Sequence, residues 1–155
     1  MGYNGLQRTL TVVAGLWVGG FVAVAYLVTP ILFSVLGDHQ VAGIVAGNIF
    51  QVEAYLSIAI SLILMIAVNF LVSKGINVYR PIRWLLLGML SCAIGAGFVL
   101  IPWMSSLRDQ ANADSISVMA SSSAALFSRL HGVSSSLFII QSVLGIVLLW
   151  RLTKK

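Results

Sequence analysis

Two charged residues in this sequence, Glu53 and Arg129, each stand beside a long apolar stretch and could form an ion pair with each other. A carboxylate near hydrocarbon is costly unless a cation such as a guanidinium pairs with it. Gln51 precedes Glu53 by two positions, His131 follows Arg129 by two, and Ser134 lies about one helical turn beyond His131. These residue types and spacings predict one polar cluster in an otherwise apolar protein.

Two interpretations of this cluster remain open from the sequence. In the first, Glu53 and Arg129 form a structural ion pair that fixes the register of two helices. In the second, the cluster is a ligand, ion or proton site in which His131 and Glu53 titrate.

Specific cofactor and catalytic chemistries find less support. A b-type haem usually takes two axial ligands on facing helices, and we expect His131 in a helix but His39 in a loop. His131, Glu53 and Met104 could be assembled around a metal ion, but no ligand spacing requires it. Ser134 near His131 lacks a nucleophile-elbow motif. We therefore predict no cofactor and no catalytic residues, and keep a haem- or metal-dependent enzyme centred on His131 as the less favoured alternative.

The elements that position these residues follow from the distribution of charge. The chain has nine basic and four acidic residues in 155, it is 59% hydrophobic, and its mean hydropathy is +1.03. Four charge-free runs of 29, 20, 24 and 21 residues lie between the charges, and about 20 apolar residues suffice to cross a bilayer. The sequence predicts an all-α integral membrane bundle of four transmembrane helices in a single domain, 1–155. We place these helices at about 9–36, 41–73, 81–104 and 124–151.

The positions of the basic residues predict the orientation of the bundle. With a cytoplasmic N-terminus, seven of the nine Lys and Arg residues lie inside, Lys154 and Lys155 among them, and Arg108 and Arg129 lie outside. This bias indicates that both termini are cytoplasmic. We expect a multi-pass protein of the bacterial inner membrane, with an outer loop over 107–123. The basic residues flank apolar segments and form no stripe interleaved with aromatics, so a nucleic-acid partner is not expected.

Small residues predict where the helices approach one another. Gly15 and Gly19 form a GxxxG pair in the first helix, which is typical of close helix packing in membranes. Further small faces are expected on the third helix, at Gly88, Cys92, Gly95 and Gly97, and on the fourth, at Gly132, Ser135, Ser136 and Gly145. Packing within the bundle is the favoured use, with a homo-oligomer as the alternative.

Several short segments resemble the transmembrane-protein-205-like family, whose bacterial members form a domain of unknown function. The segments that carry the resemblance are Gly15–Gly20, Pro30–Phe33, Ala42–Phe50, Pro102–Met104, Leu107–Arg108, Phe127, Leu130–Ser135 and Gln141–Gly145. The resemblance implies a four-helix integral membrane protein of undetermined biochemical role. The association of eukaryotic members with resistance to platinum drugs hints at metal handling. His131 and Gly132 carry over as recurring motif positions without an assigned role.

Taken together, these observations predict a small, non-enzymatic polytopic protein in a lipid bilayer. Its outer polar cluster (Glu53, Arg129, His131, Gln51 and Ser134) would bind a ligand, a metal ion or a lipid. The alternative is an accessory subunit of a larger membrane complex, such as a respiratory complex.

Overall fold

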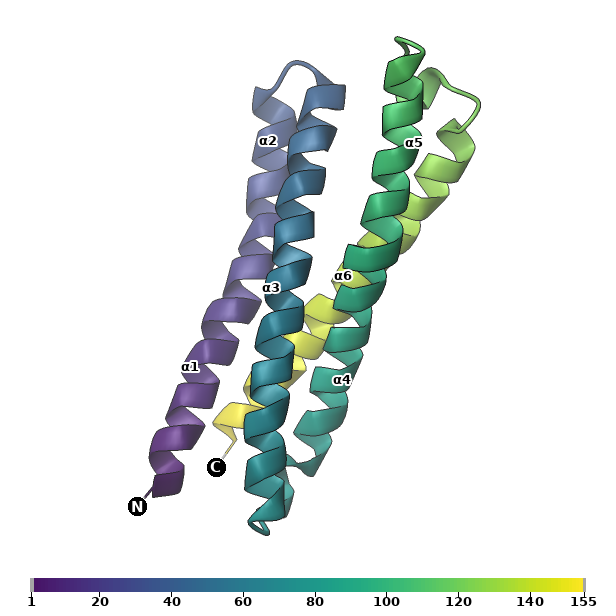
Figure 1. Cartoon of the computed structure of the whole chain (residues 1–155). Helices are drawn as coiled ribbons and strands as arrows, with labels where there is room; N and C mark the ends of the chain where they lie inside the picture. The colour runs from purple at the N-terminus through teal and green to yellow at the C-terminus, as the bar shows by residue number, and fades with distance from the viewer. Residues whose placement is uncertain (1, 155) are drawn as a thin grey trace.

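The computed structural model describes residues 2–154, with side chains from residue 5 onward, and within that range all regular structure is helical. Four segments are long and apolar enough to cross a membrane, which confirms the all-α bundle with four spanning helices (Figure 1). The first span consists of α1 (Gly2–Ala23), η1 (Val24–Val28) and α2 (Thr29–Val35), and the second span is α3 (His39–Ser73). The short η2 (Asn77–Tyr79) leads into the third span, which consists of α4 (Arg80–Ile94), η3 (Gly95–Leu100) and α5 (Ile101–Ala113). The short η4 (Val118–Ala120) precedes the fourth span, α6 (Ala124–Thr153).

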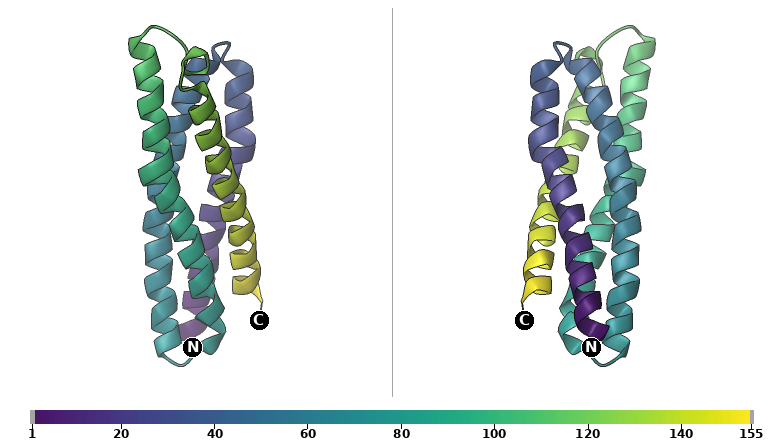
Figure 2. Two further views of the ribbon diagram at one scale, coloured as in Figure 1. Left: turned by 90° about the vertical axis from the view of Figure 1, so that its right-hand side faces the viewer. Right: turned by 90° about the vertical axis from the view of Figure 1, so that its left-hand side faces the viewer.

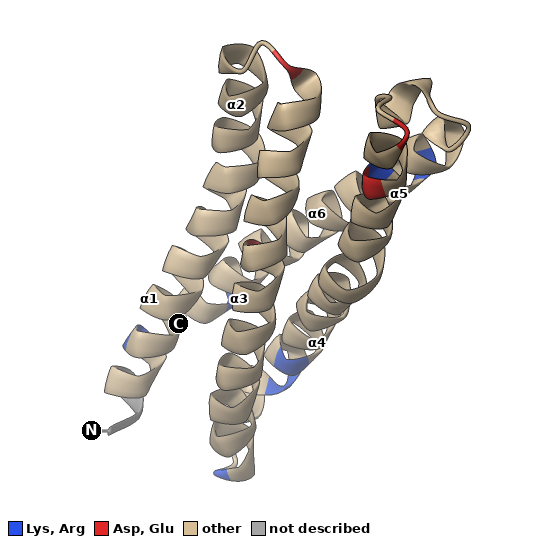
Figure 3. Ribbon diagram, turned by 45° about the horizontal axis from the view of Figure 1, so that its top comes forward, with Lys and Arg blue, Asp and Glu red and all other residues tan. Residues whose placement is uncertain are grey.

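Both termini and the α3–α4 turn lie at one end of the bundle, which we call the proximal end (Figures 1 and 2). The opposite, distal end carries the two other connections. Basic residues gather at the proximal end and acidic residues are found mainly toward the distal end (Figure 3). This distribution is the basis of the predicted cytoplasmic termini, which remain a prediction; Lys155 lies outside the described residues.

Local sequence explains where the helices begin and end. The carboxylate of Asp38 accepts hydrogen bonds from the backbone amides of Gln40 and Val41, so it caps the start of α3. His39 is therefore the first residue of a helix rather than part of a loop. At the other end of α3, Gly75 has a φ of +85°, and the Ile76 amide donates to the Leu71 carbonyl at 3.2 Å. This is a Schellman-type ending, for which glycine is the preferred residue.

The third span is longer than the sequence analysis predicted. We expected a helix ending near residue 104 and a loop from 107, but α5 continues to Ala113. Leu107 and Ala111 are buried at helical spacing, so their packing against α6 holds this polar segment in a helix despite its low hydropathy. The consequence is that Arg108 lies on a helix inside the bundle.

A proline and a π-helical segment occur together in the first and third spans. The segment η1 immediately precedes the turn that contains Pro30, and η3 immediately precedes the turn that contains Pro102. Proline removes a backbone donor and clashes with the preceding turn, and a π-bulge is one way in which a helix accommodates this. Both irregular segments lie in the middle or distal part of the bundle, where α5 separates from α3 (Figure 1).

The hydrophobic core is divided between the two ends. The proximal cluster takes buried residues from all four spans, including Phe21, Leu71, Leu86 and Leu148. The distal cluster joins α5, η4 and α6 around Met104, with Phe50 of α3 packed against it. Neither η1 nor α2 has a buried residue. The distal half of the first span is therefore left outside the core.

The closest helix approaches occur at glycines other than the GxxxG pair. A Cβ atom on Gly97 would lie 3.0 Å from the Cβ atom of Ala54, and one on Gly145 would lie 3.0 Å from the side chain of Val18. By contrast, a Cβ atom on Gly19 would have nothing within 4 Å, and one on Gly15 would only just reach a leucine methyl group. The prediction that Gly15 and Gly19 bring helices together is not met within this chain.

Candidate functional site: a cavity in the distal half

A cavity of about 770 Å³ lies in the distal half of the bundle, and we call it the distal cavity. Its lining residues come from η1, α2, α3, α5, η4 and α6, together with Ser117 just before η4. Most are apolar or aromatic, such as Phe33, Phe50 and Phe138. The polar lining residues are Tyr26, Thr29, His39, Gln40, Asn48, Gln51, Tyr55, Ser105, Arg108, Ser117, His131, Ser134 and Ser135.

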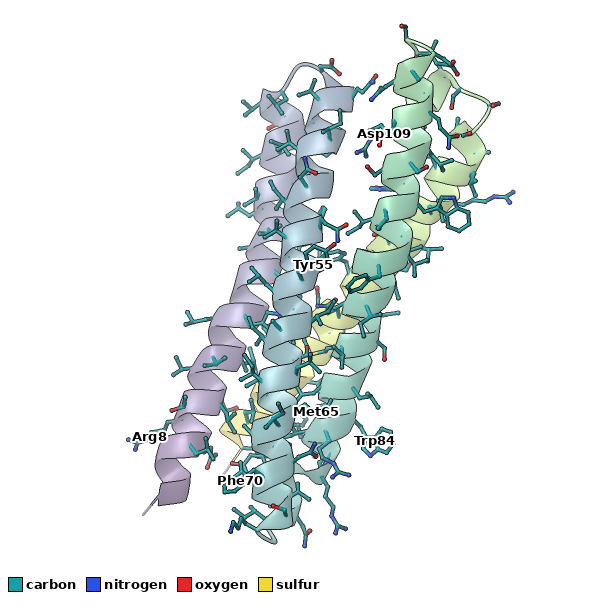
Figure 4. All side chains as sticks on the ribbon, in the orientation of Figure 1. Arg8, Tyr55, Met65, Phe70, Trp84 and Asp109 are labelled. Atoms are coloured by element: carbon teal, nitrogen blue, oxygen red, sulfur yellow. The ribbon has the colours of Figure 1, made fainter. Side chains whose placement is uncertain are left out.

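The deep end of the cavity is formed where α3 meets η3. The side-chain amide of Gln51 donates a 2.8 Å hydrogen bond to the backbone carbonyl of Gly97, within the π-helical segment. Beside it, the rings of Tyr55 and Phe98 pack with centroids 5.7 Å apart, and Figure 4 shows Tyr55 about halfway along α3, on the side of the third span. Carbonyls released in a π-bulge need a donor, and Gln51 supplies one. None of the residues of the proximal core cluster lines the cavity, so the cavity ends at this level.

Arg108 places a positive charge in the wall of the cavity. Its two terminal nitrogens face Gly43 and Gly47 of α3, where Cβ atoms would lie 3.8 and 3.4 Å away. Its guanidinium carbon lies 5.6 Å from the centre of the Phe127 ring on α6. Two glycines one turn apart therefore leave the space in which the guanidinium spans from α5 to α3. Among the described side chains the guanidinium makes no hydrogen bond, and the adjacent Asp109 is the acidic group that acts on it electrostatically.

The distal mouth is crossed by a polar contact between α3 and α5. The Gln40 amide nitrogen donates to the side-chain oxygen of Asn112, one helical turn beyond Arg108. The lateral rim differs, because Met119 and Ile139 line the cavity and yet are 61% and 55% exposed. The Gln40–Asn112 contact thus spans the mouth of the cavity on its distal, water-facing side. The cavity is open at its side, where lipid chains would lie.

Three of the five sequence-predicted site residues line this cavity. Gln51 lies at its deep end, Ser134 is buried in its wall, and His131 lines it while remaining exposed. The other two, Glu53 and Arg129, are not among its lining residues.

Glu53 and Arg129 are not brought together. Arg129 is exposed five residues into α6, whereas Glu53 is 9% exposed and lies 14 residues into α3. At 1.5 Å per residue, Glu53 is about 13 Å further along its helix than Arg129. Among the described side chains, no ion pair joins them. The predicted pairing compared where the charge-free runs begin, although the second helix was itself predicted to start near residue 41, about twelve residues before Glu53.

Glu53 instead belongs to a buried hydrogen-bond network centred on Ser57, below the cavity. The Ser57 hydroxyl donates to a carboxylate oxygen of Glu53 at 2.9 Å. It accepts from the indole nitrogen of Trp17 at 2.8 Å and from the amide nitrogen of Gln141 at 3.2 Å. One hydroxyl thereby joins α1, α3 and α6 in the centre of the bundle.

The described residues contain no group of three or more His, Cys, Asp or Glu side chains that could hold a metal ion. His39 and His131 both line the distal cavity, but without a carboxylate or thiol among the lining residues. The cavity can consequently recognise a ligand by its shape, through the positive charge of Arg108 and through several neutral polar side chains.

Comparison with known families agrees with the fold. Residues 12–113, about two thirds of the chain, match the family described as a domain of unknown function, DUF4149. The chain belongs to this family. The match ends where α5 ends, so it includes Arg108, Gly43, Gly47 and both proline turns. No curated protein and no solved structure matches the chain.

Arg108 is the residue that the sequence analysis did not select. It was one of two basic residues assigned to the outer side, but it was placed in a loop. The available signal was the pair Gly43 and Gly47, whose spacing of four predicts a smooth helix face that a long side chain can cross. Burial of Leu107 and Ala111, which keeps Arg108 on a helix, depends on tertiary packing that a single sequence does not reveal.

Proposed function

We propose that this small membrane protein binds one amphiphilic molecule of lipid type in the distal cavity. The observation that carries the proposal is the cavity itself, since its 770 Å³ lie within the roughly 300–1,000 Å³ of typical small-molecule sites. Its walls combine apolar and aromatic side chains with polar ones that could orient a ligand.

The shape of the cavity favours binding over conduction. Beneath it, all four spans pack into a core whose members Phe21, Leu86 and Leu148 are at most 1% exposed. A pathway through the bundle would have to cross this core and the Ser57 network. The cavity is a blind pocket, and its exposed lateral rim admits a molecule from the bilayer.

The position of the polar groups supports a lipid-like orientation. The third span has 37 residues, or about 55 Å of helix, whereas the hydrocarbon core measures about 30 Å. With the helix centred, about 12 Å would project at each end, and Arg108, five residues before the end of α5, is about 8 Å from that end. Arg108 then stands at the level of the headgroups, and the apolar walls below it stand at the level of the acyl chains.

A test uses two neighbouring serines of α5. Ser105 and Ser106 are both exposed, but only Ser105 lines the cavity, so we expect Ser105→Trp to occupy cavity space and use Ser106→Trp as its matched control. The protein is reconstituted in phosphatidylcholine vesicles that contain a phospholipid with a photoactivatable group in its acyl chain. We expect cross-links concentrated on the peptides that contain Thr29 and Ile139. These should be several-fold weaker in Ser105→Trp and unchanged in Ser106→Trp.

Two results would refute the proposal. The first is a set of cross-links spread evenly over lipid-facing positions such as Leu16, which is 75% exposed on the proximal half, with no enrichment at the cavity. The second is equal labelling of the two tryptophan variants.

A further inference from the structure

We infer that the distal cavity selects an amphiphile with a net negative headgroup, and that Arg108 is the residue that recognises it. The inference rests on the proposed function and adds the class of ligand. Its basis is the position of the Arg108 guanidinium on α5, which makes no hydrogen bond among the described side chains, against the Gly43–Gly47 face of α3 inside the cavity.

The charge balance of the cavity points to an anion. Arg108 is the one permanently charged side chain among the lining residues that the structure describes, and no Asp or Glu belongs to that set. Two acids lie at this end outside the lining: Asp38 caps the first turn of α3, and Asp109, which is exposed, neighbours Arg108 in sequence and acts on it electrostatically. A zwitterionic headgroup would bring a cation that finds no carboxylate there, whereas an anionic headgroup leaves no charge unmatched.

The geometry of Arg108 suits an oxyanion. Guanidinium groups present two parallel N–H donors that match phosphate and carboxylate oxygens. Gly43, Gly47 and Phe127 hold one side and one face of the group by contact without consuming its donors. A guanidinium at the edge of hydrocarbon without a partner is costly, and a headgroup oxyanion would supply that partner.

Neutral polar groups near Arg108 complete the recognition surface. Gln40, Asn48 and Ser105 also line the cavity, and each can donate to headgroup oxygens or hydroxyls. Gln40 is also bonded to Asn112, which places its side chain across the distal mouth. The headgroup would accordingly be enclosed by α3 and α5 while its chains leave through the lateral rim.

The experiment is a competition between lipids with identical acyl chains. Purified protein is placed in mixed vesicles of phosphatidylglycerol and phosphatidylcholine, with the photoactivatable chain on one lipid at a time, and cavity cross-links are counted. We expect the wild-type protein to favour the anionic lipid on the order of tenfold, the ratio expected of one charge-assisted contact. Arg108→Gln should bring the ratio close to one while total cross-linking persists.

Two further variants separate recognition from folding. Gly47→Val keeps the charge but occupies the space 3.4 Å from a guanidinium nitrogen, so it should displace Arg108 and reduce the preference. Arg129→Gln removes an exposed charge at the same end of the bundle, outside the cavity, and should leave the preference intact. Circular dichroism and gel filtration establish that each variant is folded.

The outcomes distinguish this inference from the proposed function. Equal cross-linking of both lipids at the cavity of the wild-type protein would overturn headgroup selection and leave lipid binding standing. Absence of cavity cross-links with either lipid would overturn both. An unchanged preference in Arg108→Gln, or an equal loss in Arg129→Gln, would remove Arg108 from the role. Inorganic phosphate is titrated separately into detergent-solubilised protein, and saturable binding of phosphate alone without lipid preference would overturn the lipid assignment.

Discussion

Replacing the Ser57 hydroxyl should destabilise the bundle far more than replacing the hydroxyl one turn away. Ser57 accepts from Trp17 and Gln141 and donates to Glu53, and it is completely buried. Ser61 is equally buried on the same helix, but its oxygen has no hydrogen-bond partner within the described residues. Ser57→Ala and Ser61→Ala therefore remove the same group from two equally buried positions. They differ only in the hydrogen bonds that are lost.

The magnitude follows from the two bonds that cross between helices. Interhelical hydrogen bonds in membrane proteins contribute about 0.6 kcal/mol on average and up to about 1.7 kcal/mol. Two such bonds give roughly 1 to 3 kcal/mol, and the donors of Trp17 and Gln141 are left unsatisfied in a low-dielectric interior. We expect about 2 kcal/mol of destabilisation for Ser57→Ala. For Ser61→Ala we expect no loss of stability, since no bond is lost and a buried hydroxyl without a partner is removed.

Reversible unfolding in mixed micelles or bicelles, or steric trapping, measures these free energies of unfolding. A double-mutant cycle with Trp17→Phe identifies the bond itself, because two residues in direct contact should show non-additive effects. Trp17→Phe alone also removes the donor and should cost about 1 kcal/mol. If the two alanine variants lose equal stability, or if Trp17→Phe and Ser57→Ala are additive, the network does not hold the helices as described.

Two further predictions concern packing and orientation. Gly97→Ala should destabilise the bundle by about 1–3 kcal/mol, because its Cβ atom would meet that of Ala54 at 3.0 Å; Gly19→Ala, with open space around it, should be neutral in the same unfolding assay. A fluorescent protein fused after Lys154 should fluoresce in the bacterial cytoplasm, while alkaline phosphatase inserted after Ser115, between α5 and η4, should be active outside; the reverse pattern would contradict the predicted topology.

Much of the fold could be predicted from the sequence because charge and hydropathy determine where a chain can enter lipid. Four charge-free runs defined four helices, and the structure has four segments long and apolar enough to cross a membrane. The third helix was cut short because its last residues are polar. Its extension depends on the packing of Leu107 and Ala111 against residues from other segments of the chain. The local amino-acid composition does not predict such contacts.

The candidate site was predicted less well, for a related reason. Gln51, His131 and Ser134 do line the distal cavity, since residues near the same end of facing helices tend to meet. The proposed partnership of Glu53 with Arg129 assumed that a buried carboxylate must pair with a cation. Instead, the hydroxyl of Ser57, on the same helix, donates a hydrogen bond to Glu53. Sequence spacing shows which groups share a helix face, but it does not show how far along neighbouring helices they stand.

The two halves of the bundle divide stability and recognition between them. In the proximal half, all four spans contribute to one core, and Ser57 joins three of them just above it. In the distal half, the first span leaves the core after Ala23, and Pro30 and Pro102 each follow a π-helical segment. Elements with few buried contacts open at lower free energy than the core that anchors them. A molecule could therefore enter beside Ile139 by displacing α2 and η4 while the proximal half keeps the four helices in register.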